Sequence, residues 1–345
     1  MKILIDIKHP AHVHFFKNAI YSLKKEGNEV LITARDKEMT LALLKEFGIP
    51  YIKISKIGKS KLALLAELFL RNYRFFKIAK KFKPDLMLEL MGVTAAPIGK
   101  ILNIPTLVFY DTENAKLTNP LAYFFCTEFI TPNCYKKNMG KKHLKYNGYH
   151  ELAYLHPKYF QPDVKILEEL NIKESDTFTI VRFVSWGASH DIAHKGLTIE
   201  NKIKAVEEFA KYGKVFITSE KNLPDKLKKY QLNISHKKIH SLLYYTTLIY
   251  GESATMSSEA AILGTQAIYI NNAHLGYLEE INKKYELIHL YKETKNNQTE
   301  SIKDGVRILK NKKTKNNSKL KSIKLLNEKI NVTDFIIKKI KEYEK

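Results

Sequence analysis

The sequence predicts an α/β protein built from two doubly wound domains with parallel sheets. Short apolar runs of strand length alternate with helical patterns over the first 132 residues, and the same alternation returns after residue 176. Strands separated by helices form parallel βαβ units, so each half predicts an open sheet covered on both faces. A stretch with two prolines and no clear period, residues 150–163, separates the two halves.

The length of 345 residues exceeds what a single core usually accommodates, which favours two domains. We expect an N-terminal domain over residues 1–150, a linker over 151–165, a C-terminal domain over 166–317 and a helical tail over 318–345. Ligands of doubly wound domains bind beyond the carboxyl ends of the strands. If the two sheets face each other across a cleft, function is therefore expected in the loops that follow strands.

In the first half, six apolar runs have the length and composition of buried strands. Between the first two runs, Val13, Phe16, Ile20 and Leu23 follow the three-and-four spacing of a helix, and Gly27 lies where that helix should end. The expected strands are Ile3–Ile7, Glu29–Ala34, Tyr51–Ser55, Asp85–Leu90, Thr106–Tyr110 and Glu128–Thr131.

The second half repeats this pattern, and the tail that follows is helical, with apolar residues that include Leu325, Ile336 and Ile340. The expected strands are Thr177–Phe183, Lys214–Ser219, 248–252 and 266–270. The expected helices are Ile199–Tyr212, 240–246 and 256–263.

Charge is the outlying property of the composition. Lys and Arg number 58 against 36 Asp and Glu, which gives a net charge of +22. Such an excess attracts polyanions such as nucleic acid, anionic lipid or phosphorylated substrates, although a lysine-rich solvated surface has the same composition. Nucleic acid is not expected as the partner, because the sequence contains no RNA- or DNA-binding motif.

The sequence predicts a cytoplasmic protein. Its start, MKILIDIKHP, lacks the apolar core of a secretory signal, and no window of about 18 uncharged apolar residues is present. Cys126 and Cys134 have the spacing of neither a zinc site nor a redox pair, so we interpret them as idle thiols in a reducing compartment.

Three histidines, His9, His12 and His14, follow the first strand in the stretch DIKHPAHVHFF. They could ligate a metal, but Pro10 interrupts them and no acidic cluster completes a ligand set, so we expect neither a metal nor an obligatory cofactor. We expect His12 at a helix N-terminus, where free N–H groups favour an anion and the dipole lowers the imidazole pKa. A neutral His12 could act as a base, and a histidine that only caps the helix is the alternative.

Acidic and amide side chains follow the fifth strand in FYDTENAKLTNPLA, residues 109–122. Asp111, Glu113 and Asn114 leave the strand end together. Two acids beside an amide could orient sugar hydroxyls or take a proton. A turn built from Asp and Asn would have a similar composition.

The second half opens with VRFVSWGASHDIAHKG, residues 181–196, in which small and polar residues follow the strand that contains Arg182. Small residues let a phosphate approach the backbone, and a tryptophan could stack on a base, although a single tryptophan is more often part of a core. The candidate ligand-binding residues of this loop are Ser185, Trp186, Ser189 and His190.

The most informative stretch is YGESATMSSEAAILGTQAIYI, residues 250–270. A strand runs into Ser253, Ala254 and Thr255, where a helix begins. Small side chains, free N–H groups and the positive end of a helix dipole form a cradle for a diphosphate. Glu259, one turn into the helix, could accept hydrogen bonds from ribose hydroxyls.

These residues resemble a known motif. GESATMSSEAAILGTQAIYI is similar to the strand, small-residue loop and helix of GT-B nucleotide-sugar enzymes, which include UDP-N-acetylglucosamine 2-epimerases and the N-acetylglucosaminyltransferase of peptidoglycan synthesis. The resemblance implies that Ser253, Ala254 and Thr255 contact the diphosphate and that Glu259 contacts the ribose.

The first half also resembles the peptidoglycan transferase. TENAKLTNPLA is similar to an EQNA…LTN stretch of that enzyme and matches it at Glu113, Asn114 and Ala115. HPAHVHFF lies where the transferase has a glycine-rich loop that ends in His-Val, which places His12 on the family's functional histidine. The glycines are replaced here by His9, Pro10 and Ala11, so the loop is stiffer and the acceptor is expected to differ.

Over nearly its full length, the chain looks most like one family of the GT-B superfamily, which is known only as a domain of unknown function. The stretches GYHELAYLHP and VRFVSWGASHD are part of this resemblance. The resemblance implies a glycosyltransferase that uses a nucleoside-diphosphate sugar, in cell-surface glycan or glycolipid synthesis. An epimerase acting on the same donor is the first alternative. It is weakened because Ala254, Thr255 and Ser258 replace the glycines and paired acids of the epimerases. A non-catalytic polyanion-binding protein is the second.

One further stretch, KLALLAELFLRNYRFFKIAKKFK at residues 61–83, combines leucines and phenylalanines with a basic end. A helix buried against the first sheet would have this pattern. An exposed helix of this kind would instead dock on anionic lipid and give access to a lipid-linked acceptor, with the protein peripheral on the inner face of the membrane.

Overall fold

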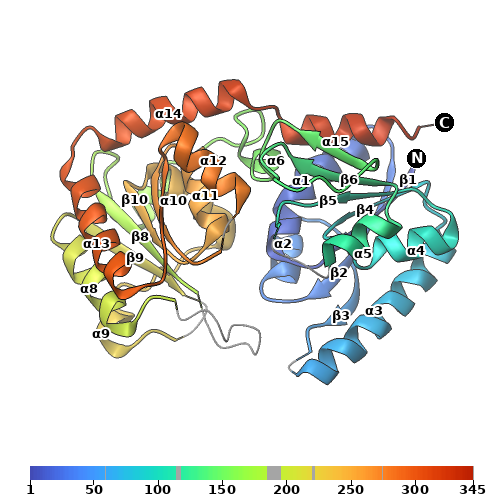
Figure 1. Ribbon diagram of the computed structural model, residues 1–345, viewed down its shortest axis with the longest axis horizontal. Helices are drawn as coiled ribbons and strands as arrows, with labels where there is room; N and C mark the ends of the chain where they lie inside the picture. Colours follow the sequence, from blue (N-terminus) through green and yellow to red (C-terminus); the bar gives the residue numbers. More distant parts are fainter. Residues whose placement is uncertain (59, 114–117, 185–195, 220–221, 274, 345) are drawn as a thin grey trace. The chain divides into compact units, whose positions relative to one another are not determined.

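The computed structural model describes residues 1–58, 60–113, 118–184, 196–219, 222–273 and 275–344 (Figure 1). Its contacts divide the chain into two compact units. Unit 1 comprises Met1–Tyr159 together with Lys329–Lys345, and unit 2 comprises Phe160–Glu328. Both units are α/β folds with parallel sheets, as the alternating pattern of the sequence predicts.

Unit 1 contains a seven-stranded parallel sheet in the order β3-β2-β1-β4-β5-β6-β7. The strand order reverses between β1 and β4, and such a switch point opens a crevice at the carboxyl ends of the strands. The strands are β1 (Lys2–Ile7), β2 (Glu29–Asp36), β3 (Ile52–Lys56), β4 (Leu86–Leu90), β5 (Thr106–Phe109), β6 (Glu128–Pro132) and β7 (His143–Tyr146).

The helices of unit 1 form two groups whose members contact each other. One group is α1, α2, α6 and α15, and the other is α3, α4 and α5. Because crossovers between parallel strands are right-handed, the reversal of strand order places these groups on opposite faces of the sheet. The helices are α1 (Pro10–Lys25), α2 (Thr40–Glu46), α3 (Lys61–Phe82), α4 (Ala95–Leu102), α5 (Thr118–Phe125), α6 (Leu152–Leu155) and α15 (Val332–Lys341).

The end of the chain belongs to unit 1, whereas the sequence pattern suggested a separate helical tail from residue 318. Helix α15 packs on α1 and α6 because Val332, Ile336 and Ile340 form a fully buried stripe at helical spacing. The Thr333 hydroxyl donates to the Ala153 carbonyl at 2.6 Å and fixes α15 on the segment expected as a linker. Residues 151–159 are therefore part of unit 1.

Unit 2 contains a five-stranded parallel sheet in the order β12-β11-β10-β8-β9. Helices α8 and α13 contact each other, while α10, α11, α12 and α14 form a second contacting group. The strands are β8 (Phe178–Phe183), β9 (Lys214–Ser219), β10 (Leu248–Gly251), β11 (Gln266–Ile270) and β12 (Ile288–Tyr291). The helices are α7 (Lys165–Glu169), α8 (Ile199–Ala210), α9 (Asp225–Lys228), α10 (Ile239–Tyr245), α11 (Ala254–Ile262), α12 (Gly276–Tyr285), α13 (Lys295–Lys310) and α14 (Thr314–Glu328), with a 3₁₀ turn at His236–Lys238.

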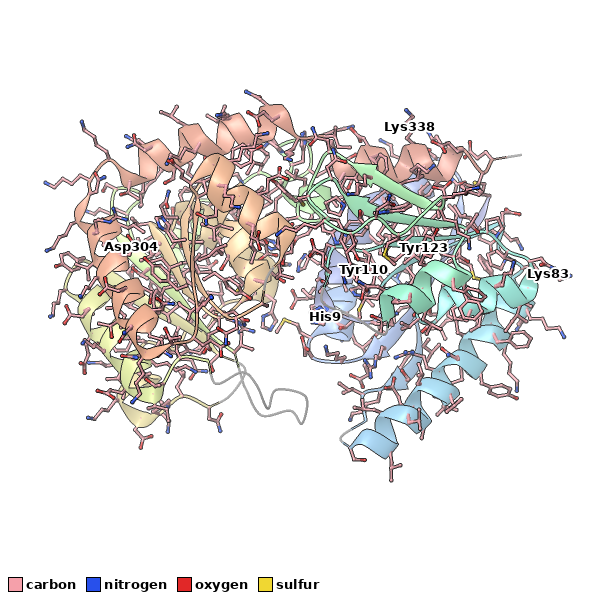
Figure 2. The ribbon with its side chains drawn as sticks, in the orientation of Figure 1. His9, Lys83, Tyr110, Tyr123, Asp304 and Lys338 are labelled. Carbon is pink, nitrogen blue, oxygen red and sulfur yellow. The ribbon has the colours of Figure 1, made fainter. Side chains whose placement is uncertain are left out.

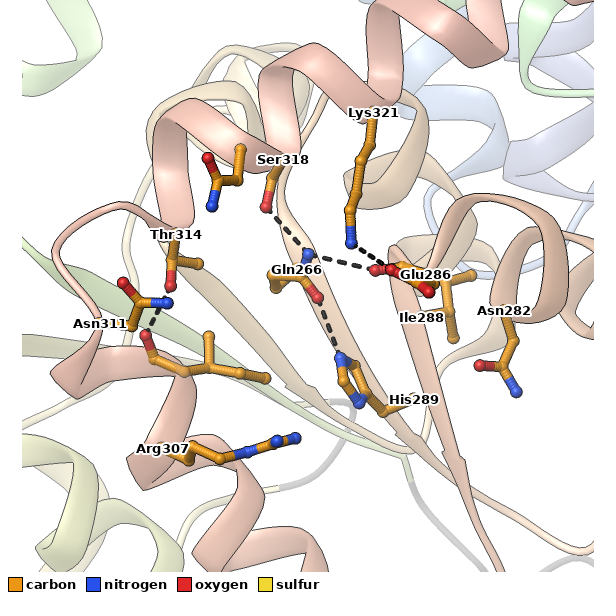
Figure 3. A pocket seen from close by; sticks show the side chains of 12 residues that line it. Gln266, Asn282, Glu286, Ile288, His289, Arg307, Asn311, Thr314, Ser318 and Lys321 are labelled. Carbon is orange, nitrogen blue, oxygen red and sulfur yellow. Dashed lines mark hydrogen bonds and ion pairs between the residues drawn. The ribbon is translucent and has the colours of Figure 1, made fainter.

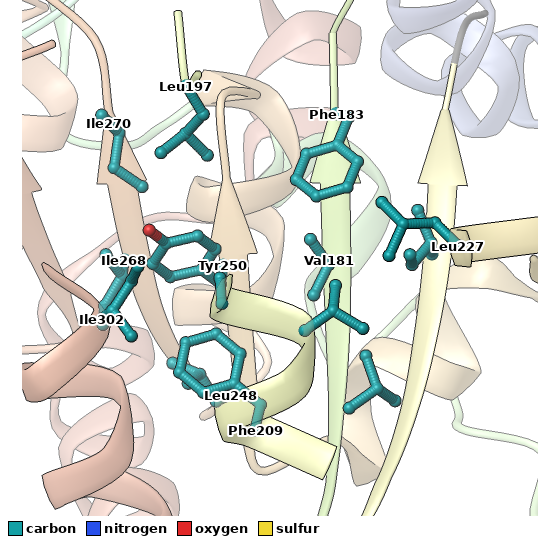
Figure 4. Packing of buried hydrophobic residues seen from close by; sticks show 14 of the residues in the cluster. Val181, Phe183, Leu197, Phe209, Leu227, Leu248, Tyr250, Ile268, Ile270 and Ile302 are labelled. Atoms are coloured by element: carbon teal, nitrogen blue, oxygen red, sulfur yellow. The ribbon is translucent and has the colours of Figure 1, made fainter. Parts of the chain in front are cut away.

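The core of unit 2 lies between its sheet and the pair α8 and α13 (Figure 4). Phe209 of α8 meets Tyr250 of β10 edge to face at 5.0 Å between ring centroids, and Ile302 of α13 joins them. The buried Tyr250 hydroxyl is hydrogen-bonded to Ser301 at 2.9 Å, so the strand that leads to the predicted cradle is fixed against α8 and α13.

Candidate functional site

The first candidate cluster lies in the turn between β1 and α1. His9 caps α1, since its Nδ1 accepts from the Ala11 amide at 3.2 Å, and Pro10 occupies the first helical position. The helix therefore begins at Pro10 rather than at Val13, because proline lacks an N–H and has a backbone angle suited to that position. The expectation that His12 lies at the helix start is confirmed, while His14 lies two residues further in.

The rings of His9 and His12 lie 6.1 Å apart between centroids, but the other contacts of the three histidines differ (Figure 2 labels His9). His9 Nε2 lies 3.3 Å from a Glu38 carboxylate oxygen. His14 packs against the rings of Phe47 and Tyr154 at centroid distances of 5.7 and 5.2 Å. Over the described ranges, no group of three or more His, Cys, Asp or Glu side chains is arranged to hold a metal ion.

His12 is buried, and its Nδ1 faces the Lys8 amide at 3.5 Å. Burial lowers the pKa of its imidazole well below the usual value, and the positive charges of Lys8 and Lys37 lower it further. The ring is therefore neutral near pH 7. A neutral buried imidazole beside a helix N-terminus can accept a proton, as expected for a base.

His150 joins this cluster, although the sequence analysis did not single it out as a site residue. Its Nδ1 lies 3.1 Å from Asp111 Oδ2, and the Thr112 hydroxyl donates to Asp111 Oδ1 at 2.8 Å. Burial raises the pKa of Asp111, but the neighbouring His150 and the hydrogen bonds outweigh this effect and keep it below the usual value. An ionised carboxylate on one ring nitrogen fixes the orientation of the imidazole.

The second ring nitrogen of His150, Nε2, is buried and has no hydrogen-bond partner among the described residues. Rings hold the imidazole in place: the Phe15 centroid lies at 4.7 Å, and Tyr146 stacks on it at 6.4 Å with an interplanar angle of 10°. His150 packs on Phe15, which lies three residues after His12 on α1, so the two imidazoles lie near the same end of that helix. His12, His150 and Asp111 thus form one proton-transfer cluster, which we call the His–Asp cluster.

The structure does not place Glu113 in this cluster. Its carboxylate accepts from the Lys136 amide at 3.4 Å, and its carbonyl oxygen accepts from Lys137 Nζ at 2.9 Å. Glu113 is buried, which favours a role in fixing the loop. Asn114, the third expected residue of this loop, lies outside the described residues.

A buried ionic network supports the carboxyl ends of β1 and β4. Glu89 forms an ion pair with Lys8 and accepts from the amides of Thr94 and Ala95, so its charge caps the start of α4. Asp6 accepts from the Thr33 hydroxyl at 2.6 Å, and burial together with the Glu89 charge raises the pKa of Asp6. The sequence does carry a signal for this network, because Asp6 and Glu89 interrupt otherwise apolar strands.

In unit 2, the turn between β10 and α11 has the predicted form. Ser253 caps α11 by accepting from the Met256 amide at 3.3 Å, and residues 253–256 are half-buried, so the helix start is open to a ligand. Gly251 precedes the turn, and a Cβ there would come within 2.0 Å of the Arg182 carbonyl oxygen. Only glycine permits this close approach of β10 and β8.

Glu259 lies one turn into α11, as expected, but it is buried and pairs with His240. The distance from its Oε1 to His240 Nε2 is 2.9 Å, and the side chains of Glu259 and His240 are only 6% and 5% exposed. His240 was missed by the sequence analysis. The contact with ribose therefore stays a prediction, and the pair with His240 gives Glu259 a structural role in joining α10 to α11.

Glu252, also missed, holds the two ends of the loop that follows β8. Its Oε2 accepts from the Val184 amide at 2.9 Å and its Oε1 from the Leu197 amide at 2.6 Å. Lys202 Nζ lies 3.4 Å from the same carboxylate. Arg182 lies half-buried on β8, whereas Ser185, Trp186, Ser189 and His190 lie outside the described residues.

A polar pocket of about 500 Å³ lies at the opposite edge of the second sheet (Figure 3). It is lined by Gln266 and Ile288, which begin β11 and β12, so it lies away from the carboxyl ends of the strands. Its charged side chains pair locally, Arg307 with Asp304 and Lys321 with Glu286. These pairings favour a structural role for the pocket.

A family model described as "Protein of unknown function (DUF354)" matches residues 1–345. The chain belongs to the DUF354 family. A curated relative from Methanocaldococcus jannaschii, described as an uncharacterized protein, is 26% identical over 281 residues, which cover 78% of this chain and 81% of that protein.

Solved structures similar to this DUF354 chain are GT-B proteins. An S. aureus MnaA structure with UDP has a TM-score of 0.72 at 14% identity and covers 99% of this chain and 96% of that one. The UDP-GlcNAc 2-epimerase of Neisseria meningitidis bound to UDP-GlcNAc has a TM-score of 0.67 at 16% identity, with 95% and 100% covered. The spinosyn rhamnosyltransferase SpnG with spinosyn aglycone has a TM-score of 0.64 at 11% identity, with 99% and 100% covered. The predicted GT-B-like pair of Rossmann-like domains is thereby confirmed.

Proposed function

We propose that this protein is a glycosyltransferase that binds the diphosphate of a nucleoside-diphosphate sugar at the start of α11. The observation that carries the proposal is the half-buried helix start at residues 253–256, where Ser253 caps α11 and the small residues Ala254 and Thr255 begin it at the carboxyl end of the second sheet. Free amides and the positive end of the helix dipole stabilise an anion there. The similar structures solved with UDP and with UDP-GlcNAc support this choice of ligand.

The His–Asp cluster of unit 1 supplies the base in this proposal. His12 is neutral, and Asp111 orients His150 so that its Nε2 is directed away from the carboxylate. Either imidazole can take the proton of an acceptor hydroxyl while the oxygen attacks the anomeric carbon. The bond from that carbon to the diphosphate oxygen breaks, and the amides of Ala254 and Thr255 stabilise the leaving diphosphate without a required metal.

An epimerase acting on the same class of donor is the second candidate. The observation that favours it is the His–Asp cluster itself, because a fixed imidazole beside a second one could also remove a proton from a sugar carbon. We rank it below the transferase because residues 253–258 carry neither the glycines nor the paired acids of the epimerases that the motif resembles.

For the acceptor we propose a cell-surface glycan precursor or a glycolipid, made on the cytoplasmic side of the membrane. The net charge of +22 supports this choice, since it attracts phosphorylated and lipid-linked substrates alike. Over the described residues, no helix is both long and apolar enough to cross a bilayer.

The test is incubation with a panel of UDP-, GDP- and dTDP-sugars, with and without polyprenyl phosphates or simple glycosides as acceptors. Nucleotide released only with acceptor is the result expected of a transferase. A changed sugar configuration without acceptor, read by NMR, would indicate the epimerase. Tight nucleotide binding without either product would contradict both enzymatic proposals.

A matched pair of variants locates the donor site. Thr255→Asp places a carboxylate in the first turn of α11, where it suits the helix dipole but repels a diphosphate. Thr299→Asp makes the same change at a half-buried position of α13. We expect nucleotide binding to be lost in Thr255→Asp and retained in Thr299→Asp. Equal affinities would place the donor elsewhere.

A further inference from the structure

Helix α3 carries a row of large apolar side chains that face solvent. Leu62 is 81% exposed and Phe69 is 69% exposed, and Leu65, Leu70 and Tyr73 are each at least 45% exposed. Figure 1 shows α3 at the margin of unit 1. Soluble proteins rarely leave a contiguous apolar patch of this kind uncovered, so the row indicates an interaction surface.

The opposite side of α3 is held firmly on unit 1, so the exposed row is not the result of a loosely packed helix. Glu67 forms an ion pair with Arg35 and accepts from the Ser55 hydroxyl at 2.6 Å, while Arg71 donates to Thr94 at 3.2 Å. Further along the same side, Phe75 is fully buried. The inner side therefore fixes which side of α3 faces solvent.

Lysines continue the exposed row toward the end of the helix. At about 100° per residue, Lys77, Lys80 and Lys81 fall on the same side as Phe69 and Tyr73. Lys77 Nζ lies 4.6 Å from the centroid of the Tyr73 ring, which joins the apolar and basic parts. The C-cap, Lys83, is labelled in Figure 2 at the basic end.

Acidic side chains are missing from this face. Glu67 is the one acidic residue of α3, and it is buried in its ion pairs on the inner side. The outer face thus combines exposed leucines and aromatics with lysines and carries no opposing charge. We call this surface, formed by Leu62, Leu65, Phe69, Leu70, Tyr73, Lys77, Lys80 and Lys81, the α3 face.

We propose that the α3 face docks on an anionic phospholipid bilayer. Aromatic and leucine side chains enter the boundary between headgroups and acyl chains, and the lysines contact the anionic headgroups. This inference goes beyond the proposed enzymatic activity and does not depend on it. A protein partner or a second copy of the chain would have less use for three lysines without acids on one face.

The position of the apolar part suggests what docking achieves. Helix α3 follows β3, so its first turns lie at the carboxyl edge of the first sheet. That edge also carries the His–Asp cluster, because β1 and β5 end there. Docking through the start of α3 brings this edge of unit 1 close to the headgroups, where a lipid-linked acceptor is presented.

The test is co-sedimentation of the full-length protein with vesicles of phosphatidylcholine, either pure or mixed with phosphatidylglycerol. We expect at least tenfold stronger partitioning onto the anionic vesicles, and a loss of at least tenfold when salt is raised from 0.1 to 0.5 M, since screening shortens the range of the attraction. Equal recovery on neutral and anionic vesicles would overturn the proposal.

Two variants and their matched controls place the contact on α3. Leu65→Ser with Phe69→Ser should reduce partitioning at least tenfold, whereas Ile199→Ser with Leu320→Ser, which alters two similarly exposed apolar residues of unit 2, should leave it unchanged. Lys77→Glu with Lys80→Glu and Lys81→Glu should reduce it at least tenfold. The charge-matched control changes Lys310, Lys312 and Lys313 to Glu, all three of which are exposed.

Circular dichroism melting shows whether each variant folds, and the polar serine substitutions on a solvent-facing surface should leave the melting temperature unchanged. Wild-type partitioning of both α3 variants would overturn the proposal. So would a concentration-dependent dimer in solution that the Leu65→Ser and Phe69→Ser change dissociates, because the α3 face would then bind a second copy of the chain.

Discussion

Replacing Glu252 with Gln tests whether this buried carboxylate holds the loop that follows β8. The wild-type carboxylate is fully buried, and each oxygen accepts a backbone amide, from Val184 at 2.9 Å and from Leu197 at 2.6 Å. Glutamine retains one acceptor oxygen and turns an NH₂ group toward the other amide. One charge-assisted hydrogen bond is lost and a buried donor then faces a donor.

The expected loss follows from these contacts. A hydrogen bond to a charged group contributes about 1.5–3 kcal/mol, and the remaining bond weakens when the charge is removed. Lys202 loses its partner, but this lysine is 19% exposed and water compensates for part of the loss. The free energy of unfolding of unit 2 should therefore fall by about 2–4 kcal/mol.

Denaturant unfolding followed by tryptophan fluorescence measures this loss. The chain has one tryptophan, Trp186, which lies in sequence between the two residues that Glu252 holds. Glu208→Gln is the control, because its pair with Lys211 lies on the surface, where water and salt screen it, and should contribute little to stability. If the free energy of unfolding of Glu252→Gln lies within 0.5 kcal/mol of the wild-type value, the proposed role of Glu252 in holding Val184 and Leu197 is wrong.

Three other substitutions have expected outcomes. Asp111→Asn should lower turnover about a hundredfold, because the amide misorients His150. The affinity for UDP, measured by calorimetry, should change less than twofold. A hundredfold loss of UDP affinity would contradict the role of the Asp111–His150 pair in proton transfer. Phe209→Ala leaves a cavity in a fully buried site beside Tyr250, so the free energy of unfolding, measured by denaturant titration, should fall by about 3–5 kcal/mol. A loss under 1 kcal/mol would refute that packing. Burial and the Glu89 charge raise the pKa of Asp6 to about 6, so the free energy of unfolding of the wild type should fall by on the order of 3 kcal/mol as pH rises from about 4 to 6. Asp6→Asn should remove this fall. If the free energies of unfolding of the two proteins change in parallel with pH, the shift is contradicted.

Much of the fold could be predicted from local patterns. Runs such as Lys214–Ser219 and Gln266–Ile270 are strands in the structure with the predicted bounds, because apolar runs of this length between helices are buried in parallel sheets. Strand β7 was not predicted. It lies at the edge of the first sheet, and its sequence HLKY is half polar, so it lacks the apolar run that marks an interior strand.

The candidate site was only partly predictable, because tertiary contacts decide it. His12 and Asp111 were found from their places after strands, but His150 lies 39 residues after Asp111 in a segment without periodicity, and only folding brings their side chains to 3.1 Å. Glu259 shows the converse. Its sequence position suggested a ribose ligand, while the partner that buries it, His240, belongs to a different helix that no local pattern connects to it.

The acids of the first sheet carried a signal that pattern analysis did not use. Asp6 and Glu89 each interrupt an apolar strand, and a buried charge requires a partner. The identity of those partners, Lys8, Thr33 and the amides at the start of α4, depends on which strands are neighbours. Strand order is a property of the whole domain, so the network could be expected but not assigned.

The most direct test of the central claim is a crystal structure of the protein with UDP bound. We expect the diphosphate at the start of α11, within hydrogen-bond distance of the Ala254 and Thr255 amides. UDP in the polar pocket beside His289 and Arg307, or no bound UDP at millimolar concentration, would contradict the proposed nucleotide site and with it the proposed use of a nucleoside-diphosphate sugar.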